Sequence, residues 1–425
     1  MRETKLLREQ IQSGSFDAEY QRLYGKAPAE SCRERWLAAI AGYEKAFGPA
    51  DRIALFSAPG RSELGGNHTD HQRGKVLAAS INLDLIAAAV PNGSGMIRIL
   101  SEGYPIDVVD LNETEPKPEE TGTSAALIRG IASRFLSLKY SVTGFDAYVT
   151  SNVLKGSGLS SSAAYEVLIG VILNGLFAEG AVSPVEIARM GQYAENVYFG
   201  KPCGLMDQMA SSVGGIISID FEKEEPAIRQ IEFDLAAFGH TLCIIDSGAD
   251  HADLTDEYAA VTRELAAVCG CFGLHVLREV PEADFFASLP AVRAIAGDRA
   301  ALRAIHIYEE NHRVDQMAAA LRAKEFGRFL SLVRESGVSS WTQLQNVVPT
   351  GSTTHQEVAL ALSLARRLLG GEGACRVHGG GFAGTLQAYV PNERLDAFVS
   401  GIETVFGKGS CHIMSIRPCG GIQLI

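Results

Sequence analysis

The sequence predicts an α+β protein with two domains, and three observations support this fold class. The chain has 425 residues, which at about 100–200 residues per domain favours two domains, or three at most. Hydrophobic residues make up 46% of the chain and charged residues 21%, so it can bury a sizeable core. Strand-like and helix-like segments are interspersed along its whole length, which is typical of mixed α and β folds.

Charge and hydropathy exclude several classes of protein. The 38 basic and 50 acidic residues give a formal net charge of −12. An acidic surface argues against general binding to nucleic acids or anionic membranes, although one basic pocket could still take an anionic ligand. Residues 1–20 are charged throughout and lack the apolar core of a secretory signal. The longest apolar stretch, near 167–177, is too short and too interrupted to span a bilayer and predicts a buried helix. We therefore expect a cytoplasmic protein without membrane or nucleic-acid partners.

The cysteines point to the same compartment. They form no CxxC pair and no zinc-ribbon spacing, so reduced thiols are expected rather than structural disulfides. The eight are Cys32, Cys203, Cys243, Cys269, Cys271, Cys375, Cys411 and Cys419.

Local patterns predict the elements of the N-terminal half. Residues 1–50 are expected to be helical because their apolar positions recur near helical spacing. A strand is expected at 53–56, followed by a turn at 58–60. Alternating apolar and polar residues predict a half-buried strand at 145–150.

A capping box predicts where the next helix begins. Residues 183–186 read Ser-Pro-Val-Glu, with proline at the first helical position. The helix should run to about residue 199, and Gly200 suits its exit. Strands are expected at 216–221 and 242–245.

In the C-terminal half, helical patterns dominate 258–269, 300–310 and 312–335. A late strand is expected at 386–390, just after a run of glycines. The charged, proline-containing segment near 222–240 suits a change of domain.

The strongest local signal is a glycine–serine loop, KGSGLSSSAA, at residues 155–164. Glycines let the backbone approach a ligand closely, and helix-forming residues follow at once. A glycine loop at a helix N-terminus offers free N–H groups and the positive end of the helix dipole, which together can cradle a phosphate. A serine-rich turn that only caps a core helix is the alternative, but three serines in this register favour the phosphate site. The candidate residues are Gly156, Ser157, Gly158, Leu159, Ser160, Ser161 and Ser162.

Three further motifs accompany this loop, which is neither a Walker-type P-loop nor part of a protein-kinase motif set. They are APGRSELGGNHTDH at 58–71, PCGLMDQ at 202–208 and HGGGFAG at 378–384. The four motifs, in this order, resemble those of the GHMP small-molecule kinases, and the first looks like the galactokinase signature. The resemblance covers roughly residues 35–425, with the galactokinase branch as the nearest relative.

This resemblance implies a two-domain fold. The N-terminal domain would be ribosomal S5 domain 2-like and the C-terminal domain ferredoxin-like, with the active site in the cleft between them. We assign residues 1–35 to an N-terminal extension, 36–225 to the domain for ATP and sugar, and 226–425 to the C-terminal domain.

The resemblance also assigns the catalytic groups. A sugar hydroxyl is a poor nucleophile, so a nearby carboxylate can accept its proton; Asp207 matches that base. Arg61 would approach Asp207 and the transferred phosphoryl group, where its charge favours ionised Asp207. Mg²⁺ prefers oxygen ligands, and Ser162 and Glu195 match the positions that serve it. Taken alone, each residue could be a cap, a salt-bridge partner or a solvated side chain.

The sugar-binding positions are matched by His68, Asp70 and Tyr258, together with Asn67. Polar groups of this kind can orient a hexose through its hydroxyls. The spacing of His68 and His71 around Asp70 could also suggest a metal site, but no third remote ligand cluster stands out.

Two substitutions weaken the assignment of galactose. Asn67 stands where galactokinases usually have a glutamate against the sugar's 6-hydroxyl. A carboxylate there would repel a uronic acid by roughly 4 kcal/mol at 4 Å with an effective dielectric of about 20, and Asn67 removes that repulsion. His71 stands where tyrosine is usual, and the run 70–72 is similar to plant galacturonate kinases. Lys155 and Ala383 also depart from the family pattern and leave the kinase interpretation intact.

We therefore expect an ATP- and Mg²⁺-dependent sugar 1-kinase that phosphorylates the anomeric hydroxyl of galactose or a close relative. The alternatives are a galacturonate (C6-altered hexose) kinase and a catalytically inactive sugar sensor of the same fold. The presence of all four catalytic and metal positions counts against the sensor. Its partners would be a small-molecule sugar and ATP, bound in one local positive pocket on an acidic surface.

Overall fold

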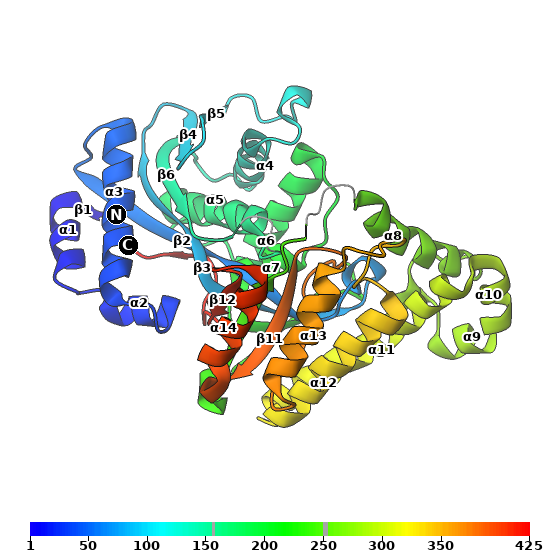
Figure 1. The fold of residues 1–425 in the computed structure, drawn as a ribbon. Helices are drawn as coiled ribbons and strands as arrows, with labels where there is room; N and C mark the ends of the chain where they lie inside the picture. The colour runs from blue at the N-terminus through cyan, green and yellow to red at the C-terminus, as the bar shows by residue number, and fades with distance from the viewer. Residues whose placement is uncertain (155–157, 250–253) are drawn as a thin grey trace.

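A computed structural model describes residues 1–154, 158–249 and 254–425 (Figure 1). Within these ranges the chain forms a nine-stranded and a four-stranded sheet, both covered by helices. This arrangement confirms the expected α+β class. All eight cysteines lie in the described ranges as free thiols. The described helices include none with the length and apolarity to cross a membrane.

The larger sheet is antiparallel except where β4 (Met96–Ser101) pairs with β6 (Phe145–Ser151). The long β3 (Lys75–Pro91) pairs with β6 through one half and with β7 (Ile216–Asp220) through the other. Strand β2 (Arg52–Gly65) pairs with β3, and both β1 (Arg2–Glu3) and β13 (Ile422–Gln423) pair with β2. Strand β5 (Ile106–Asp110) pairs with β4, and β8 (Ala227–Ile231) pairs with β7.

Helices cover both faces of this sheet, which explains why β2 is buried along almost its whole length. Ile53 and Leu55 pack with the N-terminal helices, and the alternate residues Ala54 and Phe56 pack in the main core on the other face. The helices are α1 (Thr4–Gln12), α2 (Asp17–Tyr24) and α3 (Ala29–Phe47) on the first face, and α4 (Ser124–Ser137), α5 (Ser161–Phe177), α6 (Pro184–Tyr193) and α7 (Met206–Val213) elsewhere around the sheet. The helices expected in 1–50 and at the apolar stretch 167–177 are confirmed.

The smaller sheet has the strand order β10-β11-β9-β12, and every pairing in it is antiparallel. Its strands follow a β-α-β-β-α-β sequence, as a ferredoxin-like unit requires. They are β9 (His240–Asp246), β10 (Ala374–Val377), β11 (Thr385–Pro391) and β12 (Cys411–Met414). The helices of this half are α8 (Thr255–Gly270), α9 (Glu282–Ala287), α10 (Leu289–Ala296), α11 (Asp298–Arg322), α12 (Phe326–Ser339), α13 (Glu357–Leu369) and α14 (Leu395–Phe406).

The chain passes from one sheet to the other between β8 and β9, that is, between Ile231 and His240. This point lies inside the segment 222–240 that the sequence singled out. The finer division at residue 225 and the N-terminal extension 1–35 stay predictions, since sheet membership alone does not define a domain.

The turn predicted at 58–60 is wrong, because β2 continues through it to Gly65. The chain shifts register between Pro59 and Arg61 instead of reversing. A proline is tolerated at such an irregularity, which does not need its missing N–H. Gly60 is needed for close packing, since a Cβ there would lie 2.9 Å from the carbonyl oxygen of Leu159. The strand therefore carries Arg61 directly towards the glycine–serine loop.

The helices predicted at 300–310 and 312–335 are divided at the wrong place. One helix, α11, runs from Asp298 to Arg322 without a break at 311. The interruption comes before α12, where Lys324 has a φ of 58°, a left-handed conformation that ends a helix.

The helix predicted from the capping box is confirmed. The backbone N–H of Glu186 donates to Ser183 Oγ at 3.2 Å, and α6 follows. Its last turn widens into a π-helix over Ala194–Phe199 before Gly200 ends it at a φ of 82°. The strands expected at 145–150, 216–221, 242–245 and 386–390 are confirmed as β6, β7, β9 and β11.

The end of the chain returns to the larger sheet. Strand β13 pairs with β2, and β1 pairs with β2 nearby, so the two termini lie close together (Figure 1). Arg417, which is fully buried, donates to Ser57 Oγ at 2.6 Å and to Asp84 Oδ2 at 3.1 Å. The last residues are thus part of the N-terminal core.

A buried ionic cluster joins α11 to the first motif. Glu310 accepts hydrogen bonds from Arg313 Nε at 2.7 Å, Ser336 Oγ at 2.7 Å and the backbone N–H of Gly66 at 3.1 Å. Arg376 lies between Glu310 and Glu63 and pairs with both. Burial alone would raise the pKa of Glu310, but the charges of Arg313, His306 and Arg376 outweigh it and lower the pKa to about 2.

Replacing Glu310 with glutamine should therefore destabilise the protein by about 3 kcal/mol at neutral pH, because the ionised carboxylate favours the folded state. This contribution is present above the ordinary pKa of 4.5 and is lost as pH falls towards 2. Denaturant unfolding should show that the difference in free energy of unfolding between wild type and variant is smaller at pH 4 than at pH 7. Glu309→Gln, which removes only a half-exposed partner of Arg313, should cost less than about 1 kcal/mol. If Glu310→Gln and Glu309→Gln lowered the free energy of unfolding equally, the stabilising role assigned to Glu310 would be contradicted.

Candidate active site

The centre of the site is an ion pair between Arg61 and Asp207. Arg61 Nε donates to Asp207 Oδ1 and Arg61 Nη2 to Asp207 Oδ2, each at 2.7 Å, so the pair is bidentate. Strand β2 supplies the arginine and the first turn of α7 supplies the aspartate. The Arg61 side chain is 8% exposed and that of Asp207 is 30% exposed, so a substrate can reach the carboxylate while the guanidinium stays anchored behind it.

Asp207 is held in its ionised form. Burial alone would raise its pKa, but the charge of Arg61 and the hydrogen bonds from Arg61 and Ser160 outweigh burial and lower it. Ser160 Oγ donates to Asp207 Oδ2. A carboxylate that is ionised and partly accessible is able to accept a proton from a ligand.

The glycine–serine loop ends at the N-terminus of α5, as predicted. Arg61 Nη1 donates to the carbonyl of Gly158, and the backbone N–H of Arg61 donates to the carbonyl of Leu159 at 3.1 Å. Ser160 has a left-handed φ of 53° and precedes the helix, which begins at Ser161. The loop is thus tied to Arg61, with the free N–H groups of the first helical turn beside the ion pair. Gly156 and Ser157, which were predicted to bind ATP, lie outside the described residues.

The two predicted metal ligands are both oxygen donors. Ser162 is exposed in the first turn of α5. Glu195 is buried in the π-helical segment, where its Oε1 lies 3.4 Å from Lys201 Nζ. Hydroxyl and carboxylate oxygens fit Mg²⁺, which keeps its other positions for phosphate and water. The described residues contain no group of three or more His, Cys, Asp or Glu side chains placed to hold a metal.

Three predicted sugar-binding residues contact successive carbonyls of the third motif. Asn67 Nδ2 donates to the Gly379 carbonyl at 2.6 Å, and Tyr258 Oη donates to the Gly381 carbonyl at 2.8 Å. His68 Nε2 lies 2.9 Å from the Gly380 carbonyl oxygen. The third motif thus brings together residues that lie far apart in the sequence.

Asn67 is placed differently from the other predicted sugar contacts. Its side chain is fully buried, and Asn346 Nδ2 donates to its Oδ1 at 2.8 Å. His306 Nε2 lies 3.0 Å from its backbone oxygen. The Asn67 amide therefore links the first motif to Gly379 and Asn346.

Asp70 connects the first motif with the segment that carries Asp207. A Cβ on Gly204 would lie 2.6 Å from Asp70 Oδ2, so a larger residue there would push this carboxylate aside. Burial raises the pKa of Asp70. His71, whose Nε2 is 3.3 Å from His68 Nδ1, has its pKa lowered to about 3 by burial and by the charge of His68. His71 therefore presents a neutral ring at neutral pH.

Four further residues at the site were missed by the sequence analysis. Gln208 directly follows Asp207, and Glu166 lies one helical turn after Ser162. Their proximity to these predicted site residues is the signal that could have identified them. The third, Lys201, precedes the PCGLMDQ motif. The fourth, His378, belongs to a motif that was recognised only for its glycines.

His378 connects three of the motifs. Its Nδ1 is 3.0 Å from Thr385 Oγ1 and its Nε2 is 3.2 Å from Ser62 Oγ. A Cβ on Gly158 would lie 3.3 Å from the same ring, so the imidazole packs against the glycine–serine loop at Gly158. Burial, together with the charges of Arg61 and Arg376, lowers the pKa of His378 to about 3.

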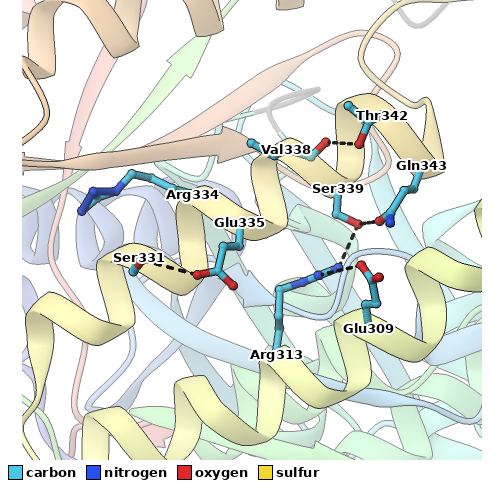
Figure 2. A pocket seen from close by; sticks show the side chains of 9 residues that line it. All are labelled: Glu309, Arg313, Ser331, Arg334, Glu335, Val338, Ser339, Thr342 and Gln343. Atoms are coloured by element: carbon cyan, nitrogen blue, oxygen red, sulfur yellow. Dashed lines mark hydrogen bonds and ion pairs between the residues drawn. The ribbon is translucent and has the colours of Figure 1, made fainter.

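A groove of about 360 Å³ lies between α11 and α12, apart from the motifs (Figure 2). Arg313 points into it and bonds to Ser339 Oγ at 2.8 Å and to Glu309 Oε2 at 3.2 Å. Ser339 Oγ is also 2.7 Å from His306 Nδ1. These side chains are already paired with one another and support Asn67 through His306.

Comparisons with known proteins agree with this geometry. The GHMP kinases N terminal domain matches residues 126–215, and the galactokinase galactose-binding signature matches residues 41–91. A galactokinase from Streptomyces coelicolor is 30% identical over 382 residues, which are 88% of this chain and 95% of the relative. One from Actinobacillus pleuropneumoniae is 31% identical over 381 residues, which are 87% and 94% of the two chains.

Solved structures give the same result. Lactococcus lactis galactokinase complexed with galactose is 25% identical, with a TM-score of 0.77 over 92% of this chain and 100% of that one. Methanococcus jannaschii mevalonate kinase, at 15% identity, shares the fold with a TM-score of 0.61 over 87% of this chain and 99% of that one. The expected GHMP kinase fold is thus confirmed, and the chain belongs to the galactokinase family.

Proposed function

We propose that this protein transfers the γ-phosphoryl group of ATP to the anomeric hydroxyl of galactose or a close relative. Membership of the galactokinase family makes it a phosphotransferase that acts on a sugar hydroxyl and uses ATP. The observation that carries the proposal is the bidentate Arg61–Asp207 pair, set at the N-terminus of α5. A cytoplasmic location, where cysteines stay reduced, is part of this proposal.

Asp207 would act as the general base. Its pKa lies below the usual range, so it is ionised at neutral pH, and its exposed edge can accept the proton of the sugar hydroxyl. A base of low pKa suits phosphoryl transfer, in which the proton need move only late because the transition state is loose. Arg61 and Ser160 hold both carboxylate oxygens, so the base does not rotate away.

The phosphates would lie over the N-terminus of α5. Its free N–H groups and helix dipole favour an anion there, and Arg61 adds a fixed positive charge from beneath. Ser162 and Glu195 would hold Mg²⁺. When bound, the metal would neutralise charge on the phosphates.

The sugar would lie between the first and third motifs. His68, Asp70 and Tyr258 would line this region, and His68 and Tyr258 contact the glycine loop 379–381. Polar groups held in this way can fix a hexose with its anomeric hydroxyl towards Asp207.

A panel of sugars tests the proposal. ATP consumption should be measured with galactose, other free hexoses and uronic acids, and the product identified by phosphorus NMR. Galactose should be converted to its 1-phosphate. A clear preference for galacturonate would replace galactose as the substrate. Tight sugar binding without turnover on any sugar would sink the enzyme assignment and leave the inactive sensor.

A further inference from the structure

Three buried polar side chains meet beside Asp207, and two of them, Glu166 and Gln208, have no role in the mechanism above. They come from three elements: Glu166 from α5, Glu195 from the π-helical segment and Gln208 from α7. Gln208 Nε2 donates to Glu166 Oε2 at 2.9 Å and to Glu195 Oε2 at 3.0 Å. One amide nitrogen therefore contacts two carboxyl groups, and it also lies 3.7 Å from Cys203 Sγ.

The arrangement is too costly to be incidental packing. Glu166, Glu195 and Gln208 are at most 4% exposed, and buried polar groups usually need hydrogen-bond partners. Within the described residues, Glu166 Oε1 and Gln208 Oε1 have no hydrogen-bond partner. Gly191 makes room for the cluster, since a Cβ there would lie 3.0 Å from Glu166 Oε2. Buried polar groups that lack partners call for a functional explanation.

The two oxygens of Glu195 face different surroundings. Its Oε2 is held inward by Gln208, whereas its Oε1 lies 3.4 Å from Lys201 Nζ, on a side chain that is 64% exposed. Gln208 thus contacts the inner oxygen of Glu195, and a cation already lies against the outer one. A π-helical turn, which often marks a functional site, presents the carboxylate to this side.

We propose that Gln208 is a positioning residue for the metal: its amide, anchored on Glu166, orients the Glu195 carboxylate for Mg²⁺. This inference rests on the proposed function, because it takes Glu195 as a ligand of the metal. Side chains that orient a metal ligand commonly change metal affinity 10- to 100-fold when they are removed.

Gln208→Met tests the proposal, because methionine keeps the length of the side chain and removes the N–H donors. Mn²⁺ would be titrated by EPR into the full chain with a non-hydrolysable ATP analogue. We expect the Mn²⁺ Kd to rise about tenfold or more, with galactose affinity unchanged. Gln192→Met is the matched control, since Gln192 donates to the nearby Cys203 carbonyl at 3.2 Å and not to Glu166 or Glu195; it should leave the Mn²⁺ Kd unchanged.

Two variants of the anchor give an independent test. Glu166→Gln keeps an acceptor for Gln208 and should retain Mn²⁺ affinity within about threefold, whereas Glu166→Leu removes the acceptor and should weaken it. An unchanged Mn²⁺ Kd in both Gln208→Met and Glu166→Leu would overturn the proposal. Mn²⁺ binding requires no turnover, so this outcome is distinct from a wild-type protein that phosphorylates no sugar.

Discussion

Replacing Asp207 with asparagine is expected to lower kcat by about 10²- to 10⁴-fold, the usual contribution of a general base. Asparagine has the same shape and keeps an oxygen for Arg61, but its amide cannot accept the proton of the sugar hydroxyl. Binding of ATP and sugar should change little, because neither depends on proton transfer. Steady-state kinetics would give kcat, and calorimetry would give both affinities.

An exposed aspartate provides the control for this variant. Asp298 pairs with Arg293 at the surface, with two-thirds of its side chain exposed, so Asp298→Asn should leave kcat and both affinities unchanged. Near-normal turnover in Asp207→Asn would remove Asp207 from the role of base. A large loss of ATP affinity would instead make it a nucleotide contact.

Replacing Arg61 with alanine is expected to lower kcat by about 10²- to 10³-fold, the loss seen when one stabilising donor is removed from a transition state. It should also change the pH dependence. The base works only when ionised, so activity falls as pH falls through its pKa. In wild type that pKa is low despite burial, because Arg61 compensates. Without Arg61 the effect of burial dominates, and the acid limb of the kcat profile should move to higher pH.

Two further variants separate charge from geometry. Arg61→Lys keeps a positive charge but loses the bidentate fork, so its acid limb should move less than that of Arg61→Ala while kcat is still reduced. Arg73→Ala removes an exposed arginine that pairs with Glu279 and should leave the profile unchanged. An acid limb at the wild-type pH in Arg61→Ala would show that Arg61 does not control the ionisation of the base.

Local chemistry made several elements predictable from the sequence. The cap at Ser183 depends on a contact within three residues, and α6 begins where expected. Likewise, α5 begins directly after the described end of the glycine–serine loop. The bidentate partners Arg61 and Asp207 are 146 positions apart, so no spacing rule could pair them. Their pairing was expected only because the motifs around them resemble a known family.

Tertiary contacts explain what the sequence could not predict. Asn67 looks like an available sugar contact in its motif, but Asn346, 279 positions away, donates to its oxygen. A proline and a glycine at 59–60 suggest a turn, yet packing against Leu159 keeps the strand going. The sequence around Gln208 does not indicate a role for it, because that role depends on hydrogen bonds to two glutamates on other helices.

The return of the chain end to the larger sheet has a consequence for protein synthesis. Strand β13 and Arg417 join the core around the N-terminal helices, whose buried hydrophobic residues all lie between positions 7 and 88. The ribosome makes β13 and Arg417 after the whole smaller sheet, so the N-terminal half cannot finish folding ahead of the C-terminal half. Until then Asp84, which is fully buried in the finished protein, lacks one of its two guanidinium partners. The N-terminal half therefore completes its packing only after the smaller sheet has been made, and not ahead of it as an independent N-terminal domain usually does.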